Sequence, residues 1–100
     1  MYSDPTWVKN VYWLPTIIFG KSWNMNLDKR NKLLENLNKK NISVRPIFYP
    51  VSSFPMYKDC PENIISQRVF LSGVNLPSYF EMNEDDVIFV VENIKRELNL

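Results

Sequence analysis

Residues 42–57 read ISVRPIFYPVSSFPMY, and this stretch decides the fold class because a strand pattern gives way within it to a long loop. The first six residues, ISVRPI, are typical of a short β-strand. From Phe48 to Pro61 the sequence then holds three prolines and four aromatic residues, with no helical or strand period. Loops this long and this apolar are uncommon unless they pack against something. The stretch predicts either a binding loop or a lid over the domain's own core.

Arg45 is the clearest chemical signal in this stretch. It precedes Pro46 and leads into Phe48 and Tyr49. A planar guanidinium beside aromatic faces suits an anionic group such as a carboxylate or a phosphate. The alternative is an edge-strand arginine that stacks on one of the two rings, and the residues alone leave both interpretations open.

The segments before this stretch predict a strand and a helix. Residues 11–19, VYWLPTIIF, form an almost unbroken apolar run that is typical of a strand buried on nearly both faces. Pro15 has no N–H, so it places this strand at an edge or interrupts it. Leucines at helical spacing predict a helix over residues 27–40, capped by Asn26. The short strand at 42–47 is expected beside or near the first one.

The segments after the stretch predict a helix, a strand and a second helix. Pro61 suits the first position of a short helix that runs to about Val69. Residues 71–77 read LSGVNLP and predict a brief strand. Asn83 is expected to cap a final helix that runs to Leu98, with three acidic residues in its first turn. This order predicts an α+β domain in which helices pack on one face of a small sheet.

Length and composition exclude or disfavour several classes of protein. The chain has 100 residues and 11.9 kDa, which is one domain over residues 1–100 and excludes a multidomain enzyme. Twelve Lys and Arg against eleven Asp and Glu give a net charge of +1, which disfavours nucleic-acid binding. No apolar run reaches the roughly 20 residues that a membrane helix needs, and residues 1–10 lack the pattern of a signal peptide. With a single cysteine, the chain is expected to be cytoplasmic.

The sequence predicts no catalytic residue and no metal site. Histidine is absent, so a Ser/His/Asp arrangement and a Cys/His ligand set are excluded. Gly20 and Gly73 are the only glycines, so a glycine-rich phosphate loop is excluded as well. Cys60 is expected to be a small, half-buried residue before a helix, with a reactive thiol as the alternative. The three acids after Asn83 are explained by helix capping.

Several motifs occur in a fixed order along nearly the whole chain. They are Val11–Trp13, Arg45–Pro50, Pro55–Tyr57, Leu76–Ser78 and Asn83–Leu98. In this order and spacing they resemble the carboxy-terminal small domain of the DegT-type sugar aminotransferases, and most of all their perosamine synthase-like branch. These are pyridoxal-phosphate (PLP) enzymes of fold type I. The resemblance implies a small, mostly antiparallel sheet with helices on one face.

The resemblance also implies what the chain contributes and what it lacks. In the family the large domain supplies the lysine that binds PLP, so this chain is expected to be inactive alone and to bind no PLP by itself. Its partner would be that large domain, in the same or a separate chain, within an enzyme that is a homodimer and aminates a nucleotide-linked keto sugar for lipopolysaccharide, O-antigen or related polysaccharide synthesis. Facing the cleft we expect Arg45, Phe48 and Tyr49, with Ser52 and Ser53 behind them. Many relatives have histidine where Ser52 stands.

Two other classes of function are consistent with parts of the sequence. A stand-alone module that binds a small ligand or a protein would explain the 14% aromatic content, which is more than a core of this size easily encloses. An RNA-binding sheet would need basic residues interleaved with exposed aromatics, and the near-zero net charge argues against it. Exposed apolar surface is expected both for an aminotransferase small domain and for a stand-alone binding module.

Overall fold

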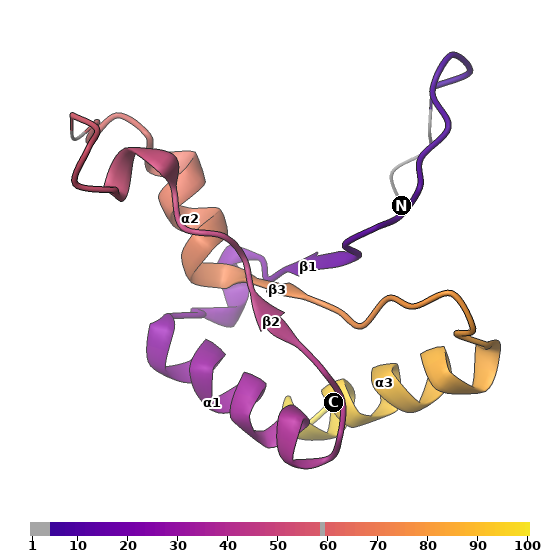
Figure 1. Cartoon of the computed structure of the whole chain (residues 1–100). Coiled ribbons are helices and arrows are strands. Elements are labelled where there is room, and N and C mark those ends of the chain that lie inside the picture. Colours follow the sequence, from indigo (N-terminus) through magenta and orange to yellow (C-terminus); the bar gives the residue numbers. More distant parts are fainter. Residues whose placement is uncertain (1–4, 59) are drawn as a thin grey trace.

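The computed structural model describes residues 5–58 and 60–100, so predictions for residues 1–4 lie outside the described part. The described residues form three short strands and three α-helices, joined by loops (Figure 1). In chain order the elements are β1 (Thr16–Ile18), the 3-10 turn η1 (Lys21–Trp23), α1 (Leu27–Lys39), β2 (Arg45–Pro46), the 3-10 turn η2 (Val51–Ser53), α2 (Ile64–Ser72), β3 (Gly73–Asn75) and α3 (Glu84–Glu97). Across the described residues, none of the helices has the length and apolar character that a membrane crossing requires.

The three strands form one antiparallel sheet in the order β1-β3-β2. Thr16 pairs with Asn75 on one side of β3, and Arg45 pairs with the same Asn75 on the other. The predicted α+β class with an antiparallel sheet is therefore confirmed. The strands β1 and β2 belong to one sheet as expected, but they are not neighbours, because β3 lies between them.

The predicted caps of two helices are confirmed. Asn26 accepts a hydrogen bond from the Lys29 N–H at 2.9 Å and begins α1. At the start of α3, Asn83 and Asp86 exchange side-chain-to-backbone hydrogen bonds at 3.0 Å in each direction, which is a capping box. Both helices therefore begin where the sequence predicts. In each, the asparagine at the N-cap accepts a hydrogen bond from a backbone N–H of the first turn, which has no partner within the helix.

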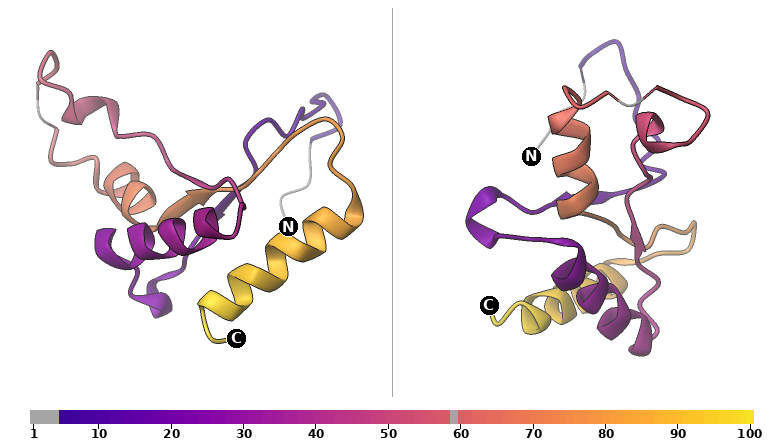
Figure 2. Two further views of the ribbon diagram at one scale, coloured as in Figure 1. Left: turned by 60° about the horizontal axis from the view of Figure 1, so that its bottom comes forward. Right: turned by 90° about the vertical axis from the view of Figure 1, so that its left-hand side faces the viewer.

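The core lies between the sheet and the helices α1 and α3, which lie together on one side of it (Figure 2). Val74 at the centre of β3 is almost fully buried and contacts this core. The other buried apolar residues are Phe19, Leu33, Leu34, Leu37, Ile42, Val44, Val90 and Ile94. Lys40 joins the end of α1 to α3 through an ion pair with Glu97 at 2.7 Å. In the described part of the chain no helix covers the opposite face of the sheet in this way, and α2 extends away from the start of β3.

The first strand is much shorter than predicted. We expected residues 11–19, whereas β1 spans Thr16–Ile18, and the side chains of Val11, Tyr12 and Trp13 are exposed. Tyr12 has a φ of 49°, which is incompatible with an extended strand. Pro15 has no N–H to donate, so sheet pairing begins after it, although its carbonyl still accepts from the Leu76 N–H at 2.8 Å.

The later elements also differ from the prediction at their ends. Only Arg45–Pro46 of the expected strand 42–47 pairs with β3, although Ile42 and Val44 are buried. Helix α2 begins at Ile64 rather than Pro61 and continues to Ser72, through residues that we had assigned to a strand. It ends because Gly73 adopts extended backbone angles. A Cβ at Gly73 would lie 1.9 Å from Cδ1 of Ile47, so glycine lets the two segments cross closely.

Arg30 of α1 is a buried charge that the sequence analysis did not identify. Arg30 is 3% exposed, and its Nη1 donates to the Phe70 carbonyl near the end of α2. The guanidinium carbon lies 4.8 Å from the centre of the Phe70 ring, in cation–π geometry. Burial lowers the pKa of Arg30 from its usual value, and interaction with Tyr49 opposes that change. Arg30 of α1 therefore holds α2 in place, because it donates to a carbonyl in the last turn of α2 that has no partner within that helix.

Candidate functional site

A surface hollow of about 440 Å³ lies where β2 meets the segment that follows β3. Arg45 and Phe48 line one part of it, and Ser78 and Tyr79 line another. Trp13, from the segment before β1, also lines it. Three separate parts of the sequence therefore form this hollow, and two of the five predicted site residues, Arg45 and Phe48, lie in it.

One row of paired residues places Arg45 on the sheet. Asn75 pairs with both Thr16 and Arg45, and residues directly opposite in an antiparallel pair point to the same face. The neighbouring row contains Ile17 and Val74, which face the core. Arg45 therefore belongs to the face of the sheet that α1 and α3 do not cover.

The side chain of Asn75 connects all three strands. Its oxygen accepts a hydrogen bond from the Thr16 hydroxyl at 2.8 Å, and its nitrogen donates to the Pro46 carbonyl at 3.3 Å. Asn75 is 7% exposed, so these polar atoms are withdrawn from water and need their partners. The backbone of β2, which carries Arg45, is thus held both by its pairing with β3 and by the side chain of Asn75.

Arg45 is exposed and is not neutralised within the described part of the chain. The three ion pairs there involve Lys39, Lys40 and Lys95. Of the described residues that line the hollow, none is Asp or Glu. A guanidinium with no carboxylate beside it retains its five N–H donors for an anion that enters the hollow.

The other three predicted site residues lie elsewhere. The Tyr49 ring packs on Phe70 of α2, with ring centres 4.6 Å apart, and does not line the hollow. Ser53 donates to the Pro50 carbonyl at 2.6 Å, which closes the turn η2. Ser52 in the same turn accepts from the side chain of Asn63 at 3.4 Å. The structure therefore brings Arg45 and Phe48 together and leaves Tyr49, Ser52 and Ser53 outside their hollow.

Tyr79 is a residue of this hollow that sequence reasoning did not single out. It hydrogen-bonds Asp86 in the capping box of α3, and this bond raises the pKa of Tyr79. The pKa of Asp86 is lowered, first by the backbone N–H of Asn83 and then by Tyr79. A signal was present in the sequence, because Tyr79 directly follows the Leu76–Ser78 motif and precedes the cap. The cap of α3 thereby positions one aromatic wall of the hollow.

The loop from Phe48 to Pro61 does not act as a lid over the core. Phe48 is 70% exposed, and Val51 and Met56 are exposed to a similar degree. The binding-loop interpretation is therefore favoured. Cys60 is half-buried before α2, as expected, and its thiol donates to the Glu62 carboxylate at 3.2 Å. Within residues 5–58 and 60–100, no three Cys, Asp or Glu side chains cluster in a way that would hold a metal ion.

Comparison with known proteins identifies the class to which the fold and the hollow belong. A sequence model of the DegT/DnrJ/EryC1/StrS aminotransferase family matches residues 2–95. The chain belongs to this family.

Individual relatives show how much of such a protein the chain represents. It is 32% identical over 88 residues to GDP-perosamine synthase from Escherichia coli O157:H7, which is 87% of this chain and 23% of that protein. It is 33% identical over 91 residues to GDP-perosamine synthase from Vibrio cholerae, which is 88% of this chain and 24% of that protein. The chain thus spans about a quarter of the length of these curated relatives.

A solved structure has the same fold. The sugar aminotransferase Spr1654 from Streptococcus pneumoniae, in its PLP form, superposes with a TM-score of 0.75 at 19% identity. The match covers 86% of this chain and 22% of that chain. The predicted fold, that of a domain of the fold type I aminotransferases, is confirmed.

The residues of the hollow do not make a PLP site on their own. PLP in such enzymes is held by a lysine through a Schiff base, with a charged partner for its ring nitrogen. The lining residues include Arg45 but neither a lysine nor an aspartate. The donor set therefore does not fit PLP, and no chemical step through the cofactor is derived for this chain.

Proposed function

We propose that the chain forms the small-domain wall of the active-site cleft in a PLP-dependent nucleotide-sugar aminotransferase. The observation that carries the proposal is Arg45, which is exposed, unneutralised and flanked by Phe48 in a hollow of a DegT-family chain. The relatives named GDP-perosamine synthase support a nucleotide-linked keto sugar as the substrate class. Such an enzyme would act in lipopolysaccharide, O-antigen or related polysaccharide synthesis.

Arg45 binds an anionic group in this proposal. Its guanidinium presents a planar set of donors, which matches the paired oxygens of a phosphate or of the carboxylate of an amino donor. Trp13, Phe48 and Tyr79 border the same hollow, and these exposed rings exclude water from it once the large domain covers them. Arginine hydrogen bonds to an anion are stronger when water is excluded. The role of this chain is binding and orientation.

The chemistry of amino transfer comes from the rest of the enzyme. PLP supplies the electron sink for amino transfer, and the lysine that holds it belongs to the large domain. The chain alone is therefore inactive and requires that domain as its partner, in the same or another polypeptide. The complete enzyme is a homodimer that acts in the cytoplasm. In this proposal the contact surface with the large domain includes the three residues outside the hollow of Arg45, which are Tyr49, Ser52 and Ser53.

Reconstitution tests this proposal. The chain is mixed with the large-domain part of GDP-perosamine synthase from E. coli, which is that enzyme without the aligned quarter. We expect formation of GDP-perosamine by the mixture and by neither component alone. Turnover by the chain alone would contradict the proposal, and so would a mixture in which the chain neither associates with the large domain nor restores activity.

A further inference from the structure

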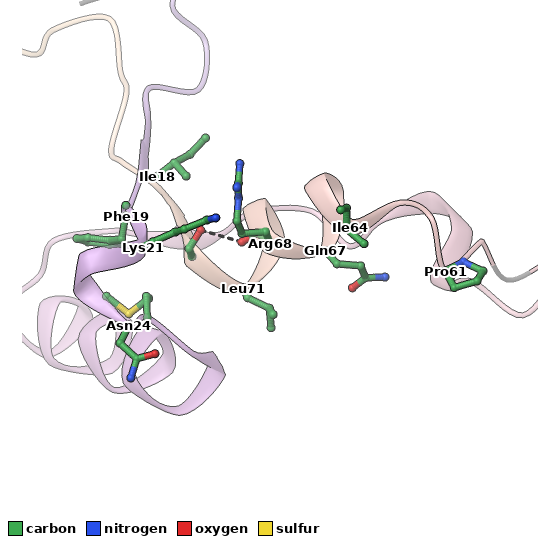
Figure 3. A pocket seen from close by; sticks show the side chains of 12 residues that line it. Ile18, Phe19, Lys21, Asn24, Pro61, Ile64, Gln67, Arg68 and Leu71 are labelled. Carbon is green, nitrogen blue, oxygen red and sulfur yellow. Dashed lines mark hydrogen bonds between the residues drawn. The ribbon is translucent and has the colours of Figure 1, made fainter.

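A second and larger hollow, of about 710 Å³, lies between the end of β1 and helix α2 (Figure 3). Its apolar lining includes Ile18, Ile64 and Leu71. Lys21, which follows β1, and Arg68, on α2, also line this hollow and bring two positive charges to it. The hollow is separate from the one that contains Arg45, and the function proposed above does not use it.

The two cations are not neutralised within residues 5–58 and 60–100. The ion pairs of that part of the chain join other lysines to Glu35, Glu92 and Glu97. Among the described residues that line the hollow there is neither Asp nor Glu. Positive charge on an apolar surface without a counter-charge indicates a partner that brings negative charge to it.

The helix beside the hollow is unsupported along most of its length. In α2 only Phe70 and Ser72, at its carboxy-terminal end, are buried. Ile64 is 70% exposed in the first turn, and Ile65 beside it is exposed to a similar degree although it does not line the hollow. A nine-residue helix with exposed isoleucines gains most of its stability from packing against another surface.

We propose that the hollow and the exposed side of α2 dock an acidic segment of the large domain, in which one or two carboxylates are flanked by apolar side chains. The inference rests on the proposed function, which supplies the large domain as partner. The carboxylates pair with Lys21 and Arg68, and the apolar side chains cover Ile64, Ile65 and Ile18. The aligned region is less than a quarter of the length of the two relatives named GDP-perosamine synthase. The rest of such a protein is large enough to cover this surface.

Two other occupants fit the surface less well. A small anion would enter the hollow but would leave Ile65 uncovered, because Ile65 lies outside the lining. A second copy in a twofold contact would place the same face against itself. That contact would bring Lys21 and Arg68 of one copy toward the like charges of the other, which is unfavourable.

The test measures binding of the full chain to the large-domain part of the E. coli enzyme by titration calorimetry. The first variant carries Lys21→Glu and Arg68→Glu, and its control carries Lys32→Glu and Arg96→Glu, which change the net charge equally on α1 and α3. We expect the first variant to bind at least about tenfold more weakly and the control to bind within about twofold of the unmodified chain. Binding of the unmodified chain is expected to weaken between 0.1 M and 0.5 M salt.

A second pair of variants tests the apolar part of the surface. Ile64→Asn is compared with Ile88→Asn, since both isoleucines are exposed on helices and only Ile64 borders the hollow. We expect Ile64→Asn to weaken binding about fivefold or more and Ile88→Asn to leave it unchanged. Circular dichroism of each variant confirms that the helices remain folded.

The possible outcomes separate this proposal from the proposed function. If the unmodified chain binds and restores activity, and the charge-reversed variant binds equally well, the docking surface is wrong while the proposed function stands. If the unmodified chain does not bind the large domain at all, both are overturned. Self-association that is abolished by the reversal, or saturable binding of inorganic phosphate that the large domain fails to displace, would assign the hollow to another occupant and overturn the proposal.

Discussion

The Thr16 hydroxyl donates a hydrogen bond to the side-chain oxygen of Asn75 at 2.8 Å, across the pair that joins β1 to β3. The amide nitrogen of the same side chain donates to the Pro46 carbonyl in β2. A sheet of strands with two or three residues has few backbone hydrogen bonds, so a side chain that binds both edges contributes much of its cohesion.

Asn75→Ala is expected to lower the free energy of unfolding by about 1–3 kcal/mol, because it removes two part-buried hydrogen bonds at once. Urea denaturation measures the change. Thr16→Val removes only one of these bonds and should cost less than Asn75→Ala. Equal stability of Asn75→Ala and the unmodified chain would show that the side chain does not hold the sheet.

Arg30→Ala is expected to lower the free energy of unfolding by about 2 kcal/mol or more. The change removes a charged hydrogen bond to the Phe70 carbonyl and the contact with the Phe70 ring. Arg96→Ala, at an exposed position of α3, is the matched control and should stay within about 0.5 kcal/mol. Arg30→Lys should recover only part of the loss, since lysine lacks the planar donor set. A full recovery by lysine would contradict the stacked geometry.

Gly73→Ala is expected to destabilise the chain by about 1–3 kcal/mol, because the new Cβ would lie 1.9 Å from Cδ1 of Ile47. Gly20→Ala is the control, since the nearest atom to its Cβ, Oγ of Ser22, is 4.0 Å away. The double variant Ile47→Ala with Gly73→Ala should be less destabilised than the sum of the two single variants. Thermal unfolding measures the stability of Gly73→Ala, Gly20→Ala, Ile47→Ala and the double variant. If Gly73→Ala were as stable as the unmodified chain, the close approach of Gly73 to Ile47 would be contradicted.

Tyr79→Phe is expected to raise the pKa of Asp86 toward its ordinary value, because the tyrosine hydroxyl is one cause of the lowered pKa. A carboxyl with a lower pKa in the folded state than in the unfolded state stabilises the fold above the unfolded pKa, about 3.9 for aspartate. That stability is lost as the pH falls through the folded pKa. Asp86→Asn should therefore reduce the acid sensitivity of unfolding.

NMR titration of the carboxyl groups measures the pKa of Asp86 directly. The pKa of Glu35, which is lowered mainly by its hydrogen bond with Lys39, serves as an internal reference that Tyr79→Phe should not move. A pKa of Asp86 that is the same with and without the Tyr79 hydroxyl would show that the bond between them does not persist in solution.

Much of the fold could be predicted where a local pattern decides the structure. Asn26 and Asn83 begin helices because their side chains satisfy nearby N–H groups, which depends on the next few residues only. Strand ends were less predictable. Whether Ile42 pairs in the sheet or only packs in the core depends on the position of β3, which comes 31 residues later in the sequence.

The candidate site could be predicted only in part for a similar reason. Arg45 and Phe48 are close in the sequence, and they share a hollow. Tyr49 is next to Phe48 in the sequence, but it packs on Phe70 because α2 extends past the loop. Tyr79 follows the Leu76–Ser78 motif, but that motif does not show that the segment after β3 meets β2, which is what brings Tyr79 to the hollow. The burial of Arg30 likewise requires the end of α2, which lies 40 residues away.

The most direct test of the account is the KM of the reconstituted enzyme for its nucleotide-sugar substrate when Arg45 is replaced. With Arg45→Ala, the chain should still associate with the large domain as tightly as before, while KM rises about 10–100-fold through loss of a charged hydrogen bond. Arg96→Ala should change neither quantity. An unchanged KM and turnover with Arg45→Ala, in a complex that assembles normally, would contradict the assignment of this hollow to the substrate.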